Sequence, residues 1–366
     1  MRKVIISTGG TGGHIFPALS VIEEIKRRFP QCCILFVGGR YGPEKSLVTR
    51  AGIDFEALPV KGILGKGLEA VVSFFFLSQS LIKAFFLLRR FRPDLVLGFG
   101  GYAGFCMARV ACLLGIPTAI HEQNSVPGSS NRILAGKVDK VFLTFPGSNF
   151  GGKEEIITGN PVRRDIAALF DEQQPAADSI RSLLVLGGSQ GAAAINEAVI
   201  RALPDFRSKG IMLWHQTGEK HFAAVRAAYD EHYPQARVSP FIEDMSEAYR
   251  FADLVLCRAG ATTIAELTLA GKPAILVPYP YAAHDHQMKN AKMVEESGAA
   301  LVLQQSYFEQ VRLVEVVDNL ASVPGKLNSM SVAARSLAYP AAAQKIVSEL
   351  ESFLRGKNGK HEDIVE

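Results

Sequence analysis

The sequence predicts an α/β fold with two doubly wound parallel sheets, and three observations support this prediction. Short apolar strands alternate with helical patterns along 366 residues, a length that suits two domains. Glycine-rich turns follow several of these strands. A strand, loop and helix unit at residues 4–19 has a counterpart that begins at residue 183, about 180 residues later. This repetition predicts two Rossmann-like domains that face a central cleft.

The composition agrees with a packed α/β protein, because 48% of the residues are hydrophobic and 33 are glycine. Residues 1–160 contain 19 Lys+Arg against 11 Asp+Glu, a balance of +8, and the remainder contains 21 against 25, a balance of −4. We therefore expect an anionic surface to meet the first half. Five cysteines without a CxxC pattern, and an N-terminus without a signal-peptide apolar region, predict reduced core thiols in a cytoplasmic protein.

The first strand, Val4 to Thr8, runs into Gly9-Gly10-Thr11-Gly12-Gly13-His14 and then into a helix. Glycines permit positive φ angles and let a ligand approach the backbone N–H groups, while the helix N-terminus favours an anion. His14 ends this loop and can exchange a proton near neutral pH. It is therefore a candidate catalytic base, with a structural histidine as the alternative.

The next elements are strands at 34–37 and 55–58 with a helix near 43–50 between them. Residues 71–88 form an 18-residue apolar run, but Ser78-Gln79-Ser80 and Lys83 interrupt it, which argues against a membrane span. The pattern fits a membrane-surface helix and a core helix equally well. The loop before it, where Lys61 and Lys66 flank Ile63 and Leu64, predicts contact with an anionic membrane.

A further strand at 94–98 ends in a glycine turn that contains Gly100, Gly101 and Tyr102. The strand at 116–120 then delivers His121-Glu122-Gln123-Asn124 to the same edge. Four adjacent hydrogen-bonding side chains suit a polyhydroxylated ligand, and the alternative is a polar loop with its own capping bonds. His121 and Glu122 are rival candidates for the catalytic base.

Strands at 138–143 and 156–157 complete the first domain, and glycine and proline at 158–163 mark the junction. We expect a first Rossmann-like domain at 1–160 and a second at 161–335. Residues 336–366 would form a helix at 340–354 that packs back on the N-terminal domain, followed by a mobile tail at 355–366.

The second domain repeats the opening design, with a strand at 183–186, the loop GGSQG at 187–191 and a helix at 192–202. A dinucleotide site is disfavoured because Ile15 stands where GxGxxG requires glycine, and no GxxxxGK[ST] occurs. A nucleotide-sugar site explains the polar and glycine-bearing turns of the second domain better than a dinucleotide or P-loop site does. We expect Ser189, Gln190 and the helix start at Ala261-Thr262-Thr263 to bind the diphosphate. Glu266 would bind the ribose, and Gln287 and Asn290 would bind sugar hydroxyls.

Nine segments together resemble a known family: GGTGGH, FGGYAG, HEQN, SVPG, TGNPVR, GGSQGA, HQTG, CRAGATTIAEL and DHQMKNA. From residue 3 to about residue 300 the chain resembles the peptidoglycan UDP-N-acetylglucosamine (UDP-GlcNAc) transferases of glycosyltransferase family 28. The resemblance implies a GT-B fold, with a membrane-associated acceptor site in the N-terminal domain (1–160) and UDP-sugar held mainly by the C-terminal domain (161–335). It also implies a peripheral protein on the cytoplasmic face of the bacterial inner membrane. It implies transfer of GlcNAc to lipid I (undecaprenyl-pyrophosphoryl-MurNAc-pentapeptide), giving lipid II, and protein partners in wall synthesis; we expect no nucleic acid.

The resemblance also assigns residues. It implies that the backbone of Ile242 meets the uracil, that Glu266 binds the ribose, that residues 261–263 bind the phosphates, and that His14 is the proposed base. The remaining donor residues are Gly10, Thr11, Gly12, Asn124, Arg163, Ser189 and Gln287. The acceptor side is Gly13, Gly100, Gly101 and Tyr102. Ala103-Gly104-Phe105 and Ser129-Ser130 depart from the family pattern there.

An inverting transfer needs a base opposite the departing diphosphate, and a positioned imidazole contributes roughly 10²- to 10⁴-fold. Helix N-termini and loop donors can stabilise the leaving group. No DxD pair lies near the phosphate loops, so we expect no obligatory metal or cofactor. The alternatives are another lipid glycosyltransferase, such as a diacylglycerol galactosyltransferase, a UDP-GlcNAc epimerase, and a non-catalytic nucleotide-sugar binding protein.

Overall fold

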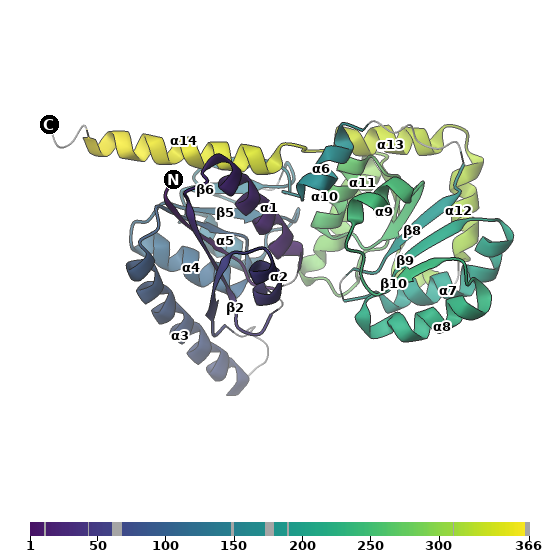
Figure 1. The fold of residues 1–366 in the computed structure, drawn as a ribbon, viewed down its shortest axis with the longest axis horizontal. Coiled ribbons are helices and arrows are strands. Elements are labelled where there is room, and N and C mark those ends of the chain that lie inside the picture. Colours follow the sequence, from purple (N-terminus) through teal and green to yellow (C-terminus); the bar gives the residue numbers. More distant parts are fainter. Residues whose placement is uncertain are drawn as a thin grey trace. The chain divides into compact units, whose positions relative to one another are not determined.

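The computed structural model describes residues 1–10, 12–42, 44–60, 68–147, 150–172, 179–188, 190–309 and 311–362, with the side chains of 68–74, 309 and 358–362 left aside. The chain divides into two compact units (Figure 1). The N-terminal unit comprises Met1–Arg163 and Ala341–Glu366, and the C-terminal unit comprises Arg164–Pro340.

The N-terminal unit is built on a seven-stranded parallel sheet with the order β3-β2-β1-β4-β5-β6-β7. Its strands are β1 (Lys3–Ser7), β2 (Cys33–Gly39), β3 (Asp54–Leu58), β4 (Leu95–Gly98), β5 (Thr118–Glu122), β6 (Lys140–Leu143) and β7 (Glu155–Ile157). The strand order reverses between β1 and β4. In open parallel sheets such a switch point creates a crevice at the carboxyl ends of the two strands.

Helices cover both faces of this sheet: α1 (Gly12–Arg28), α2 (Glu44–Arg50), α3 (Leu68–Phe91), α4 (Gly101–Leu113), α5 (Ser129–Ala135) and α14 (Ala342–Glu362). Alternate residues of β1 enter different cores, as expected for a strand buried on both faces. Val4 and Ile6 share one core with residues of α1 and α14, whereas Ile5 packs with residues of α3 and α4.

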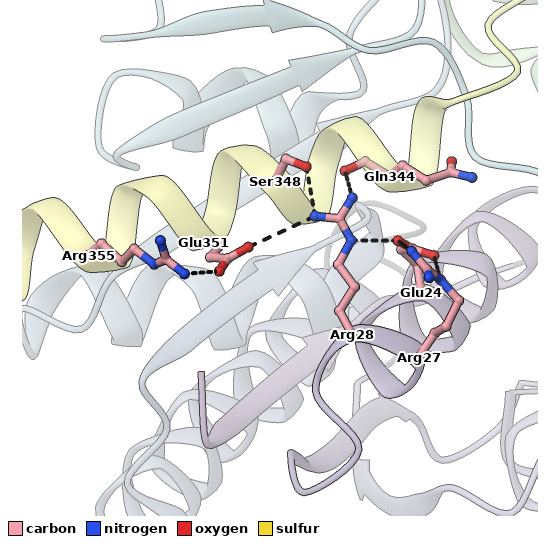
Figure 2. A network of polar contacts seen from close by, with 7 residues as sticks. All are labelled: Glu24, Arg27, Arg28, Gln344, Ser348, Glu351 and Arg355. Carbon is pink, nitrogen blue, oxygen red and sulfur yellow. Dashed lines mark hydrogen bonds and ion pairs between the residues drawn. The ribbon is translucent and has the colours of Figure 1, made fainter.

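Helix α14 lies beside α1 and extends past the end predicted from the sequence (Figure 1). Figure 2 shows the polar part of this packing, in which Arg28 Nη1 donates to Ser348 Oγ at 2.8 Å and Nη2 donates to the Gln344 carbonyl at 3.3 Å. Ile346 and Leu350 of α14 are fully buried in the same core. Residues 355–362, which the sequence pattern assigned to a polar tail, continue the helix.

The C-terminal unit contains a six-stranded parallel sheet with the order β10-β9-β8-β11-β12-β13, again with a reversal beside its first strand. The strands are β8 (Ser182–Leu186), β9 (Met212–Gln216), β10 (Arg237–Ser239), β11 (Leu254–Cys257), β12 (Ala274–Leu276) and β13 (Ala300–Val302). The helices are α6 (Arg164–Ala167), α7 (Ala193–Ser208), α8 (Phe222–His232), α9 (Met245–Phe251), α10 (Ala261–Ala270), α11 (His286–Glu296), α12 (Leu313–Ser322) and α13 (Lys326–Ser336). Short 3-10 helices occupy Ala168–Phe170, Glu219–His221, Ala283–Asp285 and Gln305–Glu309.

Two details differ from the expectations. The strand predicted at 116–120 is β5, which continues through His121 and Glu122, so both side chains belong to the sheet rather than to the loop after it. The five cysteines are free, but only Cys106 and Cys257 are buried and Cys33 is exposed, so the prediction of core thiols was wrong for part of the set.

Among the described residues, no helix has the length and apolarity needed to cross a bilayer.

Candidate active site

Two glycine-rich turns meet at the switch point of the N-terminal sheet. The Gly9 N–H donates to the Gly100 carbonyl oxygen at 3.2 Å. Gly101 has a φ of +70°, and a Cβ atom there would lie 2.1 Å from the Gly9 carbonyl oxygen. Glycine is therefore required at this position both by the backbone conformation and by the close approach of the first turn. The loop after β1 and the start of α4, where Tyr102 follows, thus form one surface.

His14 stands on this surface, in the first turn of α1. Its Nδ1 atom lies 2.7 Å from Gln123 Oε1, and its ring remains partly exposed. A Cβ atom on Gly100 would lie 3.4 Å from His14 Cε1, so the turn packs closely against the ring. The carboxyl edge of β5 therefore orients the imidazole that the sequence singled out.

His121 lies behind Gln123 and is fully buried. Its Nε2 atom is 3.1 Å from the Gly159 carbonyl oxygen, and its ring lies against Phe99 with centroids 5.4 Å apart. Burial lowers the pKa of His121 from 6.5 to about 4, because a charged imidazole loses its hydration there. This neutral, enclosed ring is poorly placed to take a proton from a substrate.

Glu122 is also buried and uses both carboxylate oxygens to hold the following loop. Oε1 accepts from the N–H of Asn124 at 3.0 Å and from its Nδ2 at 3.2 Å. Oε2 accepts from the Gly128 N–H at 3.1 Å and from Asn131 Nδ2 at 2.9 Å. The hydrogen bonds of Glu122 therefore match the alternative stated for this stretch, a polar loop with its own capping bonds. Among the three candidate bases, the geometry favours His14.

Sequence reasoning missed Glu44. Its side chain is 1% exposed, and Oε1 accepts from the Gly10 N–H at 3.0 Å. Glu44 therefore shapes the glycine loop from the first turn of α2. In the sequence it has the appearance of an ordinary acidic residue at a helix N-terminus, and nothing in the local pattern connects it with a loop 34 residues earlier.

The remaining predicted residues of the N-terminal unit that the structure describes lie on or near this edge. Gly12 and Gly13 open α1 beside His14. Asn124 follows β5, and the Arg163 guanidinium lies 5.7 Å from the centre of the Phe16 ring on α1. Six predicted residues lie outside the described residues: Thr11, Lys61, Ile63, Leu64, Lys66 and Ser189.

In the C-terminal unit, α10 begins at the carboxyl end of β11, and its first residues are Ala261, Thr262 and Thr263. The N-cap residue is Gly260, which has no side chain to cap the helix, and a helix start of this kind has backbone N–H groups that can bind phosphate. Glu266 lies further along α10, where its Oε2 accepts from the Tyr249 hydroxyl at 2.9 Å. Tyr249 is fully buried and so holds the carboxylate from behind.

Helix α11 provides the second group of donor-site candidates. Gln287 Oε1 accepts from the Tyr279 N–H at 2.9 Å, and Asn290 Nδ2 donates to the Ala259 carbonyl oxygen at 3.4 Å. His284 and Asp285, just before α11, both have a φ of +54°, a conformation that costs about 1–3 kcal/mol for residues other than glycine. Backbone strain of this kind clusters at ligand sites.

Gln190 is exposed in the loop after β8, and Ile242 is 3% exposed in the segment between β10 and α9. Both follow the carboxyl ends of strands, as do α10 and the segment before α11. The predicted donor residues of this unit that the structure describes therefore lie on segments that follow the carboxyl ends of its strands.

Two parallel sheets, each with a strand-order reversal beside its first strand, are the architecture of the GT-B glycosyltransferases, and the comparisons with known proteins place the chain in this class. The family model described as "Glycosyltransferase family 28 N-terminal domain" matches residues 4–143, and "Glycosyltransferase family 28 C-terminal domain" matches residues 182–346. The chain belongs to glycosyltransferase family 28.

Curated relatives cover nearly the whole chain. A protein of Nitratidesulfovibrio vulgaris (strain DP4), named UDP-N-acetylglucosamine--N-acetylmuramyl-(pentapeptide) pyrophosphoryl-undecaprenol N-acetylglucosamine transferase, is 49% identical over 97% of this chain and 98% of its own length. A protein of the same name from Solidesulfovibrio magneticus is 45% identical over 96% and 97%.

Solved structures agree on the fold. The crystal structure of Acinetobacter baumannii MurG is 33% identical, with a TM-score of 0.77 over 96% of this chain and 100% of that one. A Neisseria meningitidis UDP-GlcNAc 2-epimerase bound to UDP-GlcNAc has a TM-score of 0.66 at 14% identity over 96% and 100%, a likeness of fold alone.

Proposed function

We propose that this enzyme is an inverting hexosyltransferase that moves GlcNAc from UDP-GlcNAc to the 4-hydroxyl of MurNAc in lipid I, giving lipid II. The observation that carries the proposal is the 49% identity, over 97% of the chain, with a relative of that name. The oriented, partly exposed His14 at a glycine-lined switch point supports it, since a transferase needs a base for the acceptor hydroxyl.

In the proposed reaction the acceptor oxygen attacks C1 of GlcNAc as the bond between C1 and the diphosphate oxygen breaks. The hydroxyl proton passes to His14, and UDP leaves with the bonding electron pair. Attack opposite the leaving group inverts the configuration at C1. The N–H groups at the start of α10, with Thr262 and Thr263, stabilise the charge that develops on the diphosphate.

The other donor contacts follow the family assignment. Glu266, steadied by Tyr249, would accept hydrogen bonds from the ribose hydroxyls, and the backbone of Ile242 would meet the uracil. Gln287 and Asn290 would contact sugar hydroxyls. Further donor contacts are assigned to Gly10, Thr11, Gly12, Asn124, Arg163, Ser189 and Gln190, and the acceptor side is assigned to Gly13, Gly100, Gly101 and Tyr102.

We also infer a peripheral position on the cytoplasmic face of the inner membrane, where a lipid-linked acceptor would be met. Helix α3 exposes large apolar side chains, with Phe75 57%, Ile82 59% and Phe86 66% exposed. The Arg89 guanidinium lies 5.3 Å from the centre of the Phe85 ring, so cationic and apolar groups are adjacent on this helix. This mixture suits an anionic lipid surface.

The test is an acceptor screen with the purified protein and radiolabelled UDP-GlcNAc. We expect label in lipid II when lipid I is present. Transfer to diacylglycerol alone would favour the other lipid glycosyltransferases, and release of free sugar or a 2-epimer without an acceptor would favour an epimerase. Binding of UDP-GlcNAc without any turnover would leave a non-catalytic binding protein.

A further inference from the structure

The hydrogen bonds behind His14 determine which of its ring nitrogens carries the proton. They begin at the Gly159 carbonyl oxygen, 3.1 Å from His121 Nε2. A carbonyl oxygen can only accept, so His121 Nε2 must donate. Because burial lowers the pKa of His121 to about 4, the ring is neutral at pH 7 and carries that one proton. His121 Nδ1 is therefore an acceptor.

The side-chain amide of Gln123 is oriented by this acceptor and by two more. Gln123 Nε2 lies 3.1 Å from His121 Nδ1, and 3.4 Å from both the Phe99 and the His121 carbonyl oxygens. All three neighbours accept hydrogen bonds, so the amide nitrogen must face them. Gln123 is only 2% exposed, so if its amide oxygen and nitrogen exchanged places, water could not replace the hydrogen bonds that would be lost. Its oxygen therefore points the other way.

That oxygen faces His14. Gln123 Oε1 lies 2.7 Å from His14 Nδ1 and can only accept, so Nδ1 must carry the proton. A neutral imidazole has a single ring proton, which leaves Nε2 of His14 with an unshared electron pair. In water the Nε2–H form of a neutral histidine predominates, so this arrangement selects the less common tautomer.

We propose that Gln123 and His121 are positioning residues that hold His14 in the Nδ1–H tautomer and so present Nε2 as the base. The inference rests on the proposed transfer, in which His14 accepts the proton of the acceptor hydroxyl. It extends that function by assigning a role to two side chains that do not touch substrate. We call the hydrogen-bonded series from the Gly159 carbonyl through His121 and Gln123 to His14 the relay. Because the Gly159 carbonyl oxygen can only accept, it determines which atom donates at each later hydrogen bond of the series, as far as Nδ1 of His14.

The direct test is nitrogen NMR of the full chain labelled with 15N-histidine, without substrates and at a pH where His14 is neutral. The signals of His14 are identified by their loss in His14→Gln. The expected result is a protonated Nδ1 and an unprotonated Nε2. A His14 in the Nε2–H form, or an even mixture of tautomers, would overturn the proposal.

A pair of variants separates positioning from mere space filling. Gln123→Met keeps nearly the same volume but removes the oxygen that faces His14. Gln123→Glu keeps an accepting oxygen there whether the carboxyl is charged or protonated. The relay predicts that kcat falls about tenfold or more in Gln123→Met with KM for UDP-GlcNAc little changed, and that Gln123→Glu retains more activity and the Nδ1–H form of His14.

A purely structural role predicts the opposite order, because methionine suits a buried site better than a carboxyl group. Equal kcat in the two variants, or more activity in Gln123→Met, would contradict the relay. If either variant fails to fold, the tautomer of the wild-type protein decides the question. Gln344→Met is the matched control, since this residue of α14 bonds Arg28 through its backbone oxygen, and it should change neither kcat nor the tautomer.

The proposed transfer and the proposed tautomer of His14 can be refuted separately. If the wild-type protein does not transfer GlcNAc to lipid I, the proposed function fails while the tautomer remains measurable. If transfer is observed and His14 is found in the Nε2–H form, the relay alone fails.

Discussion

At the scale of single residues, His14 is the side chain on which the proposed chemistry depends. We predict that His14→Ala lowers the rate of GlcNAc transfer by roughly 10²-fold or more, because the acceptor hydroxyl loses its base. Binding of UDP-GlcNAc, measured by calorimetry, should persist. An unchanged rate of transfer to lipid I would remove His14 from the mechanism.

Glu122 should behave differently from a base. Its two oxygens accept from Asn124, Gly128 and Asn131, so Glu122→Gln turns an N–H₂ group toward groups that themselves donate. We predict a loss of about 1–3 kcal/mol in the free energy of unfolding, measured in urea. A variant of full stability with abolished kcat would instead support Glu122 as the base.

At the scale of elements, α3 can be tested as a membrane contact. Replacing Phe75, Ile82 and Phe86 with serine removes three exposed apolar side chains, and we predict weaker binding to phosphatidylglycerol vesicles in a sedimentation assay. The vesicle binding that remains should fall further with added salt, because it would then depend on electrostatic attraction between the arginines of α3 and the anionic lipid. The control replaces the exposed Val323 and Val332 of the C-terminal unit with serine, and equal binding by both variants would refute the α3 surface.

The packing of α14 on α1 can be tested at a buried apolar side chain of α14. Leu350 is fully buried, so we predict that Leu350→Ala lowers the free energy of unfolding by about 2–5 kcal/mol, measured by denaturant unfolding. Arg355, whose side chain is 80% exposed and pairs with Glu351 of the same helix, serves as the control. Arg355→Ala should cost less than about 1 kcal/mol, and a cost equal to that of Leu350→Ala would contradict this ranking.

At the scale of the whole molecule, both units contain a buried neutral histidine, which predicts sensitivity to acid. Burial lowers the pKa of His121 from 6.5 to about 4 and that of His215 from 6.5 to about 3. In the unfolded chain these groups bind protons below about pH 6.5, while the folded chain resists protonation. Each histidine therefore contributes stability above that pH that is lost as the pH falls.

Urea unfolding between pH 7 and pH 5 checks this expectation. The slope attributable to one such group approaches about 1.4 kcal/mol per pH unit. His121→Asn should flatten the dependence by removing one contribution. An identical slope in wild type and variant would show that His121 does not titrate differently in the folded and unfolded states.

Much of the architecture followed from local pattern. Both parallel sheets were predicted from the alternation of apolar strands with helices and from the glycine turns at strand ends. These features can be recognised within a few consecutive residues, because a strand buried on both faces is continuously apolar and a tight turn needs glycine. The position of His14 after the first glycine turn was predicted on the same ground. Assignments such as Glu266 to the ribose and Gln287 to the sugar remain predictions that binding measurements must test.

The sequence by itself determined the fold class and the family, and it singled out His14 as the candidate base, because each of these rests on short contiguous segments of the chain. Only the tertiary structure decided what surrounds that imidazole. Gln123 lies 109 residues from His14, and the Gly159 carbonyl lies 38 residues from His121, so no local pattern relates them. Burial, amide orientation and tautomer depend on which distant groups packing brings within hydrogen-bond distance, and packing is a property of the folded chain.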